Sequence, residues 1–321
     1  MATPRQQIID FIEQERLPKE NVQRALILTQ VYPSGKAWRG FVESLCLYLG
    51  GLAFGVAAIF FVAYNWVELG RFAKFAMVEL LMVAGVIAYW KFGDHKIIGP
   101  LSLIVSTLLL GALMALYGQT YQTGADPWQL FFNWALLMLP WAFVARSSVL
   151  WIVWLSLLNL SILLYYQTFR GLLGVLFYSE ESLLWIVFSL NTAALLLWEY
   201  CARIWDWLQP RWAPRLLAVG SGLSMTWLCF VGIFDSVNSP TGVAWLIWMG
   251  LFYFIYRKVK PDLFMLAGLC LSGIVVTVAF CSEYILSDAD EGTFLLLAII
   301  VLGLGAGSAV WLKRVNEELQ S

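Results

Sequence analysis

Ten long apolar segments account for most of this sequence, and they constrain the fold more than any other feature. Crossing a hydrocarbon core of about 30 Å takes roughly 20 helical residues, and these segments approach or exceed that length. A span in lipid must satisfy its backbone amides internally, so we expect each segment to be an α-helix. The predicted spans are residues 42–64, 72–90, 100–117, 128–145, 148–166, 182–198, 213–234, 240–256, 262–281 and 292–312. The predicted fold class is therefore all-α, a polytopic membrane helix bundle of about ten transmembrane helices.

The placement of basic residues predicts the orientation of these spans. If the N-terminus is cytoplasmic, all of the 20 lysines and arginines except Arg71, Lys74 and Arg170 fall on the cytoplasmic side. Loops rich in Lys and Arg are retained in the cytoplasm, so this bias predicts that both termini are cytoplasmic. No cleavable signal peptide is visible in the first forty residues. The formal net charge of −1 gives no reason to expect nucleic acid as a partner, and the lipid bilayer is the expected surroundings.

We divide the chain into four parts. Residues 1–41 alternate apolar and charged side chains at helical spacing and are interrupted near residues 32–35, which predicts a cytoplasmic amphipathic helical hairpin. Residues 42–166 form the first five-helix half, and residues 167–181 are an outer segment with enough apolar side chains to lie on the membrane. Residues 182–321 form the second five-helix half with a short cytoplasmic tail. An odd number of spans in each half permits inverted repeats, as in many secondary transporters.

Two predicted outer connections concentrate the polar side chains. The first connection contributes Tyr64, Asn65, Glu68 and Arg71. The second contributes Gln119, Tyr121, Gln122 and Asp126, and Gly118 and Gly124 allow unusual backbone angles there. A set of neutral amides and hydroxyls like this can bind a sugar, a headgroup or a peptide strand, although a solvated turn is the alternative. Asn133 lies one helical turn beyond the second connection and joins the candidate set.

Glu79 is the most unusual residue of the predicted spans. It lies eight residues beyond Arg71, about 12 Å deeper at 1.5 Å per residue, and so near the middle of the membrane. Ionisable side chains at this depth are costly and often functional. We therefore predict that Glu79 forms the protonatable floor of an outward-facing vestibule. The alternative is a hydrogen-bonded carboxyl group that only holds helices together.

The sequence offers little for metal or covalent chemistry. It contains 5 cysteines without C-x-x-C spacing and 1 histidine, so we expect no metal site and no cofactor. The motifs typical of metalloproteases, serine hydrolases and P-loop nucleotide-binding proteins do not occur in it. We therefore predict no catalytic residues and no enzymatic activity.

Residues 61–66 (FVAYNW) and 117–128 (YGQTYQTGADPW) resemble the signature of a bacterial family of polytopic membrane proteins of unknown function. Genes of this family often lie beside genes for membrane-anchored proteins of the GDYXXLXY type. The resemblance covers the N-terminal hairpin and the first five spans. It implies a bacterial inner membrane and a possible membrane-anchored partner, but no reaction.

Three functions are compatible with these observations. The first is binding or transport of a small polar or amphiphilic ligand through the vestibule between the first four spans. The second is a non-transporting assembly subunit that pairs with a GDYXXLXY-type partner. The third is an intramembrane enzyme that uses carboxylates on a lipid-linked substrate.

Overall fold

The computed structural model describes residues 4–14, 16–29, 34–64, 68–95, 97–168, 180–234, 240–284 and 291–320. Over these residues the chain is almost entirely helical and contains no strand, which confirms the predicted all-α class. The helices divide into two compact units, Ala2–Thr168 and Phe169–Ser321. The predicted outer segment at residues 167–181 lies largely outside the described residues.

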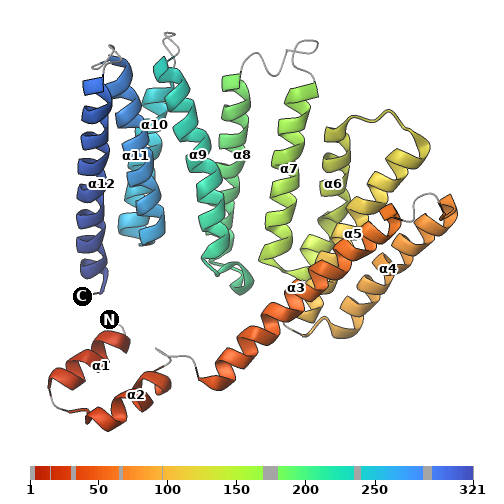
Figure 1. The fold of residues 1–321 in the computed structure, drawn as a ribbon, viewed down its shortest axis with the longest axis horizontal. Coiled ribbons are helices and arrows are strands. Elements are labelled where there is room, and N and C mark those ends of the chain that lie inside the picture. Colours follow the sequence, from red (N-terminus) through yellow and green to blue (C-terminus); the bar gives the residue numbers. More distant parts are fainter. Residues whose placement is uncertain are drawn as a thin grey trace. The chain divides into compact units, whose positions relative to one another are not determined.

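The first unit begins with two short helices and continues with five long ones (Figure 1). The short helices α1 and α2 contact each other and are joined through a 3₁₀ turn, as expected for a helical hairpin. Their bounds are α1 Pro4–Glu13, η1 Lys19–Asn21 and α2 Val22–Leu28. The long helices are α3 Gly35–Tyr64, α4 Arg71–Phe92, α5 Ile98–Tyr121, α6 Pro127–Ala145 and α7 Ser148–Thr168. Helix α3 thus begins at Gly35 instead of residue 42, because the helix continues through its basic flank.

Helix α5 is the centre of the first unit and contacts α3, α4 and α6, while α7 packs on α6. Small residues allow these close approaches. The Ser106 hydroxyl donates a hydrogen bond of 3.1 Å to the carbonyl of Met82, opposite Gly85 of α4. The indole N–H of Trp134 donates to the carbonyl of Thr107 at 2.9 Å, which fixes the ring directly over Gly111. Hydroxyls of the third span therefore serve helix packing here.

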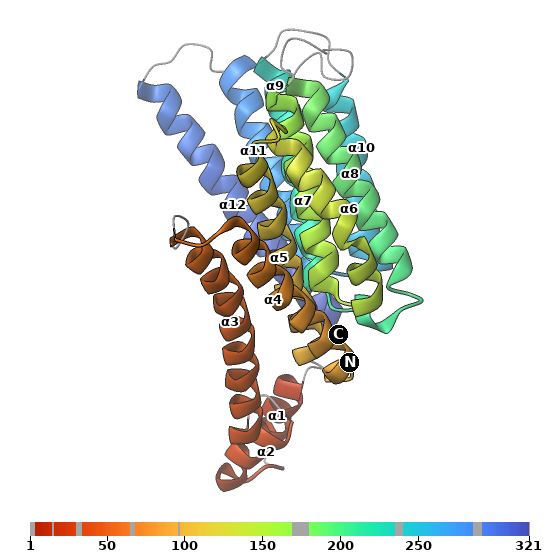
Figure 2. The ribbon, with the colours of Figure 1, turned by 90° about the vertical axis from the view of Figure 1, so that its right-hand side faces the viewer.

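The second unit contains five further helices, seen in succession from green to blue in Figures 1 and 2. Helix α9 contacts α8, α10 and α11, and α12 packs on α11. Hydroxyl pairs link α9 to its neighbours, Thr192 with Ser221 and Thr226 with Ser272, both at 2.7 Å between oxygens. The bounds are α8 Glu180–Cys201, η2 Asp206–Leu208, α9 Trp212–Phe234, α10 Thr241–Phe254, the π-helical turn η3 Ile255–Val259, α11 Leu263–Tyr284 and α12 Glu291–Gln320.

Each of the ten predicted apolar segments coincides with a helix, but nine helices of the described chain have the length and composition of a membrane span. The exception is α10, which has 14 residues before the backbone changes to a π-helical turn of 5 residues. The two pieces together cover the predicted segment at residues 240–256. The side of the membrane on which each loop lies stays a prediction.

The packing of α5 against α6 generates a prediction about Gly111. A Cβ atom there would lie 2.5 Å from the Trp134 ring, and the hydrogen bond of Trp134 keeps the ring in place. We expect Gly111→Ala to lower the free energy of unfolding by about 1–3 kcal/mol, as overpacking does. The matched control is Gly50→Ala on α3, where a Cβ atom meets nothing within 4 Å. Thermal unfolding of the purified variants in detergent measures the difference, and equal melting temperatures would contradict this packing.

Candidate functional site

The first predicted outer connection is largely exposed. Tyr64 ends α3 and its side chain is 90% exposed, and Asn65 lies outside the described residues. Glu68 is exposed in the turn that follows. Arg71 begins α4, and its guanidinium lies 5.3 Å from the centre of the Phe72 ring. The described side chains of this connection, Tyr64, Glu68 and Arg71, are therefore not part of a buried pocket wall.

The second predicted connection is a tight turn between α5 and α6. Gln122 adopts a left-handed conformation with φ 44°, and its N–H bonds the carbonyl of Gly118. Gly124 also has a positive φ of 64°, as predicted, but Gly118 lies inside α5, so the expectation of an unusual angle there was wrong. Gln122 takes that role because the helix continues past Gly118. Asp126 precedes α6 in an extended conformation and its side chain makes no capping hydrogen bond.

Tyr121 is the residue of this turn that contacts another helix. Its ring lies 6.0 Å from Phe75 of α4 and 4.9 Å from Tyr117, and it is half exposed. Gln119 is also exposed at the end of α5. The structure thus joins the second connection to the start of α4 through aromatic rings instead of polar groups.

Glu79 lies on the exposed side of α4, away from the core of the first unit. It shares this side with Phe72, Val83 and Ile87, whereas Lys74 and Val78 are buried. Asn133 is likewise exposed, on α6. Within the described residues Glu79 has no hydrogen bond or ion pair. In the part of the first unit that the structure describes, Glu79, Asn133 and the polar turns therefore do not share a buried site.

Charged side chains instead gather at one end of the second unit, the lower end in Figure 1. Asp262, which precedes α11, accepts hydrogen bonds from Arg211 at 3.0 Å and from Arg215 of α9 at 3.2 Å. Its other oxygen accepts the Phe264 N–H at 3.0 Å, an N-cap of α11. The side chain of Asp262 is only 2% exposed. We call the set Glu199, Arg211, Arg215, Tyr256, Lys260 and Asp262 the ion cluster.

Glu199 extends the ion cluster to the end of α8. Its carboxylate pairs with Arg211 at 2.9 Å and with the Lys260 amine at 2.6 Å, and the same amine donates to the backbone carbonyl of Glu199. The Tyr256 hydroxyl lies 3.4 Å from the Glu199 carboxylate. One carboxylate thus joins α8, the start of α9 and the π-helical turn.

The ion cluster holds two carboxylates and three cations, so it is positive by one charge when these five groups are ionised and Tyr256 is neutral. Burial alone would lower the pKa of the Arg211 guanidinium, but the charge of Glu199 and the hydrogen bonds to Asp262 outweigh it and the pKa rises above its usual range. Arg211 therefore stays charged at any physiological pH.

Little in the sequence indicates the ion cluster. Its charges lie at predicted cytoplasmic span ends, where lysine, arginine and their counterions are common. Arg211 and Asp262 are separated by 51 residues, and Lys260 and Glu199 by 61. The nearest clues are the charged junction at residues 260–262 and the basic residues beside Trp205 and Trp207.

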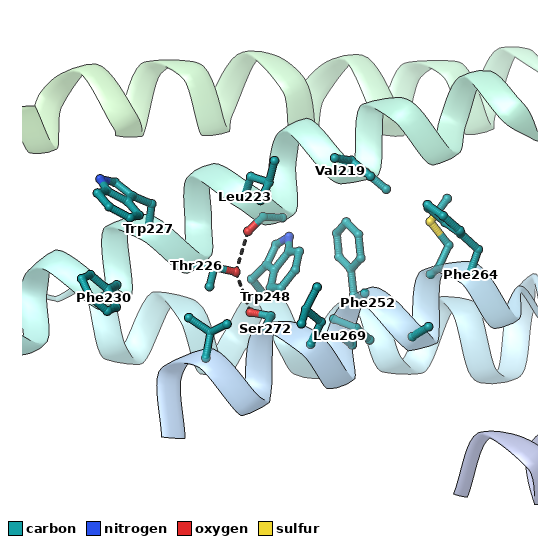
Figure 3. Close-up of a pocket in the computed structure, with 17 residues that line it drawn as sticks. Val219, Leu223, Thr226, Trp227, Phe230, Trp248, Phe252, Phe264, Leu269 and Ser272 are labelled. Carbon is teal, nitrogen blue, oxygen red and sulfur yellow. Dashed lines mark hydrogen bonds between the residues drawn. The ribbon is translucent and has the colours of Figure 1, made fainter. Parts of the chain in front are cut away.

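An apolar groove adjoins the ion cluster. A cavity of about 520 Å³ lies between α9, α10 and α11, within the volume range of roughly 300–1,000 Å³ that small-molecule sites occupy (Figure 3). Its lining is aliphatic and aromatic apart from the hydroxyls of Thr226 and Ser272, which bond each other. Trp248 of α10 lines the groove, is 6% exposed, and its buried N–H has no acceptor within the described residues. We call this cavity the α9–α11 groove.

Aromatic rings connect the groove to the ion cluster along α10. The Trp248 ring lies 4.5 Å from Phe252, which lies 5.4 Å from Tyr256. These residues are spaced by four and therefore lie on one side of the helix. The row begins at the groove lining and ends at the hydroxyl beside Glu199.

These features define a multi-helix membrane protein with a charged cluster and an apolar groove in its second unit. A family model described as "Predicted membrane protein (DUF2157)" matches residues 8–151. This match confirms the resemblance to a membrane-protein family of unknown function, and it contains both predicted outer connections. No curated protein and no solved structure matches the chain. The second unit lies outside the matched residues.

The buried carboxylate of Asp262 generates a prediction. We expect Asp262→Asn to lower the free energy of unfolding by about 1–3 kcal/mol. This loss is smaller than the loss expected on breaking a fully buried ion pair, because both arginines are partly exposed. Asparagine also caps helices well, so the variant tests the charge. The control is Glu318→Gln, an exposed partner of Arg257, with an effect within about 0.5 kcal/mol. Chemical unfolding in detergent compares the two variants. Equal losses of unfolding free energy would contradict a stabilising role for the buried charge of Asp262.

Proposed function

We propose that this protein binds an amphiphilic molecule within the membrane and holds its apolar chain in the α9–α11 groove. The observation that carries the proposal is the continuity of an apolar groove with a charged cluster at one end. An amphiphile likewise has an apolar chain with a polar or charged headgroup at one end. Binding alone is proposed, without a chemical step, in keeping with the prediction that the protein is not an enzyme.

The dimensions of the groove support an elongated occupant. Its α9 lining runs from Ala218 to Phe230, which is about 18 Å at 1.5 Å per residue. Half of a hydrocarbon core is about 15 Å. A groove of this length fits a chain that reaches from one membrane surface towards the middle.

The ligand class is the one predicted from the sequence, but its place in the chain differs. The predicted vestibule between the first four spans stays a prediction. Its residues Glu79 and Asn133 are exposed on the first unit. Movement of the ligand across the membrane also stays a prediction.

The proposal is tested by filling the groove. Gly268 lines it, and a Cβ atom there meets nothing within 4 Å, so the backbone position accepts a side chain and Gly268→Leu adds volume to the groove. We expect this variant to retain at least about fivefold less phospholipid than the wild type after detergent washing, measured by native mass spectrometry. A leucine side chain displaces chain contacts worth about 1.5–3 kcal/mol, which is the basis of this figure.

The matched control for this test is Gly250→Leu on α10. A Cβ atom at Gly250 also meets nothing within 4 Å, and Gly250 does not line the groove. It introduces the same side chain into the same unit. Equal lipid retention by the two variants would contradict the proposal.

A second function, that of an assembly subunit, is favoured by the exposure of Glu79. A carboxyl group on an otherwise apolar side of α4 is costly in lipid and is stabilised when another protein surface covers it. The occupant we propose is a membrane-anchored protein of the GDYXXLXY type, as the family resemblance implies.

A photoreactive residue at Val83, four positions from Glu79 on the same side of α4, tests the assembly role. With the membrane-anchored protein co-expressed, we expect an adduct of the two chains that decreases at least severalfold on Glu79→Leu. The control position is Phe60 of α3, which is also exposed. An adduct formed only within a single chain would instead mean that the second unit covers Glu79.

A further inference from the structure

We propose that the amphiphile of the α9–α11 groove is an anionic phospholipid whose phosphate group is bound by Arg215. This inference rests on the proposed function and adds the identity of the headgroup. It is carried by the position of Arg215 at the end of the groove, by its exposure and by the charge of the ion cluster.

Arg215 lies on the side of α9 that lines the groove. The lining residues Ala218, Gly222 and Thr226 follow it at intervals of three or four, the spacing that keeps side chains on one side of a helix. The Arg215 guanidinium lies over the ring of Phe264, 5.5 Å from the ring centre. Phe264 belongs to α11 and lines the opposite wall of the groove. Figure 3 shows Phe264 at one end of the row of lining residues. Arg215 therefore stands at the end of the groove nearest the ion cluster.

Arg215 has donors left for an anion. It binds Asp262 through Nε and one terminal nitrogen, each at 3.2 Å. A guanidinium has five N–H donors, and the side chain of Arg215 remains 43% exposed. Asp262 is shared with Arg211, so its negative charge does not neutralise Arg215 by itself.

The ion cluster as a whole also favours an anion. Its three cations face two carboxylates, and the second carboxylate, Glu199, is occupied by Arg211 and Lys260. One phosphate diester would bring the set to neutrality. Arginine suits this role because its planar donors match the oxygens of a phosphate.

The predicted orientation agrees with this headgroup. Arg215 lies in the first turn of α9, at the end of the helix that the distribution of basic residues assigns to the cytoplasmic side. The cytoplasmic leaflet carries the anionic lipids that attract basic residues near the membrane surface. A headgroup without a phosphate group would gain nothing from the unbalanced positive charge.

The experiment compares two lipids with identical acyl chains, phosphatidylglycerol and diacylglycerol, which lacks the phosphate group, on the purified full-length protein by native mass spectrometry. We expect the wild type to bind phosphatidylglycerol more tightly. Arg215→Gln should weaken phosphatidylglycerol binding about tenfold, the order expected for a lost charged hydrogen bond, and leave diacylglycerol binding unchanged. Arg215→Lys should recover part of the preference, because it restores the charge.

Two controls keep the result interpretable. Arg203→Gln removes an exposed guanidinium from the connection between α8 and α9 and should change neither lipid. The melting temperature of Arg215→Gln reports whether the unit folds, and Asp262 keeps its bond to Arg211 in that variant.

The outcomes separate the headgroup from the groove. No preference in the wild type, or an equal loss of both lipids in Arg215→Gln, would overturn the phosphate assignment while the groove proposal stands. Unchanged binding of both lipids in Gly268→Leu would instead overturn the groove proposal, because the lipid then binds elsewhere.

Discussion

The carboxylate of Asp262 is the contact on which the end of the second unit depends. It is nearly inaccessible to solvent and caps α11. It also binds two guanidinium groups, that of Arg211 directly before α9 and that of Arg215 in α9. A buried carboxylate is tolerated only when its charge is balanced and its oxygens are bonded. Arg211 also pairs with Glu199, and Glu199 pairs with Lys260. One chain of ion pairs therefore joins α8, α9 and the π-helical turn to α11.

This chain of ion pairs defines one end of the α9–α11 groove. Farther along, α9 and α11 meet through the hydroxyls of Thr226 and Ser272, and the aromatic row of α10 lies beneath them. The result is a surface that changes from charged to apolar over the length of a lipid chain. Such a surface discriminates amphiphiles by headgroup at one end and tolerates different chains at the other, because apolar contacts are not directional.

The sequence predicted the helices well because membrane spans depend on local hydropathy. Each predicted span coincides with a helix, although nothing in the composition indicated the change to a π-helical turn at Ile255. The fate of Glu79 could not be predicted, because it depends on how α4 is rotated. The close approach of Gly85 to Ser106 sets that rotation and turns Val78 towards the core and Glu79 away from it.

The candidate site was missed for a related reason. The pairs that build the ion cluster lie far apart in the sequence, and their separate members look like ordinary flanks of spans. Gly124 shows the opposite case, since a glycine in a polar turn predicts a positive φ from local chemistry alone. Long-range charge pairing is therefore the part of this protein that only the fold makes visible.

An experimental density map of the full-length protein in nanodiscs that contain an anionic phospholipid is the decisive test of the proposed lipid site. We expect elongated density along α9 from Ala218 to Phe230 that continues into a headgroup beside Arg215. A groove closed by contact between α9 and α11, or filled by helices of the first unit, would contradict it.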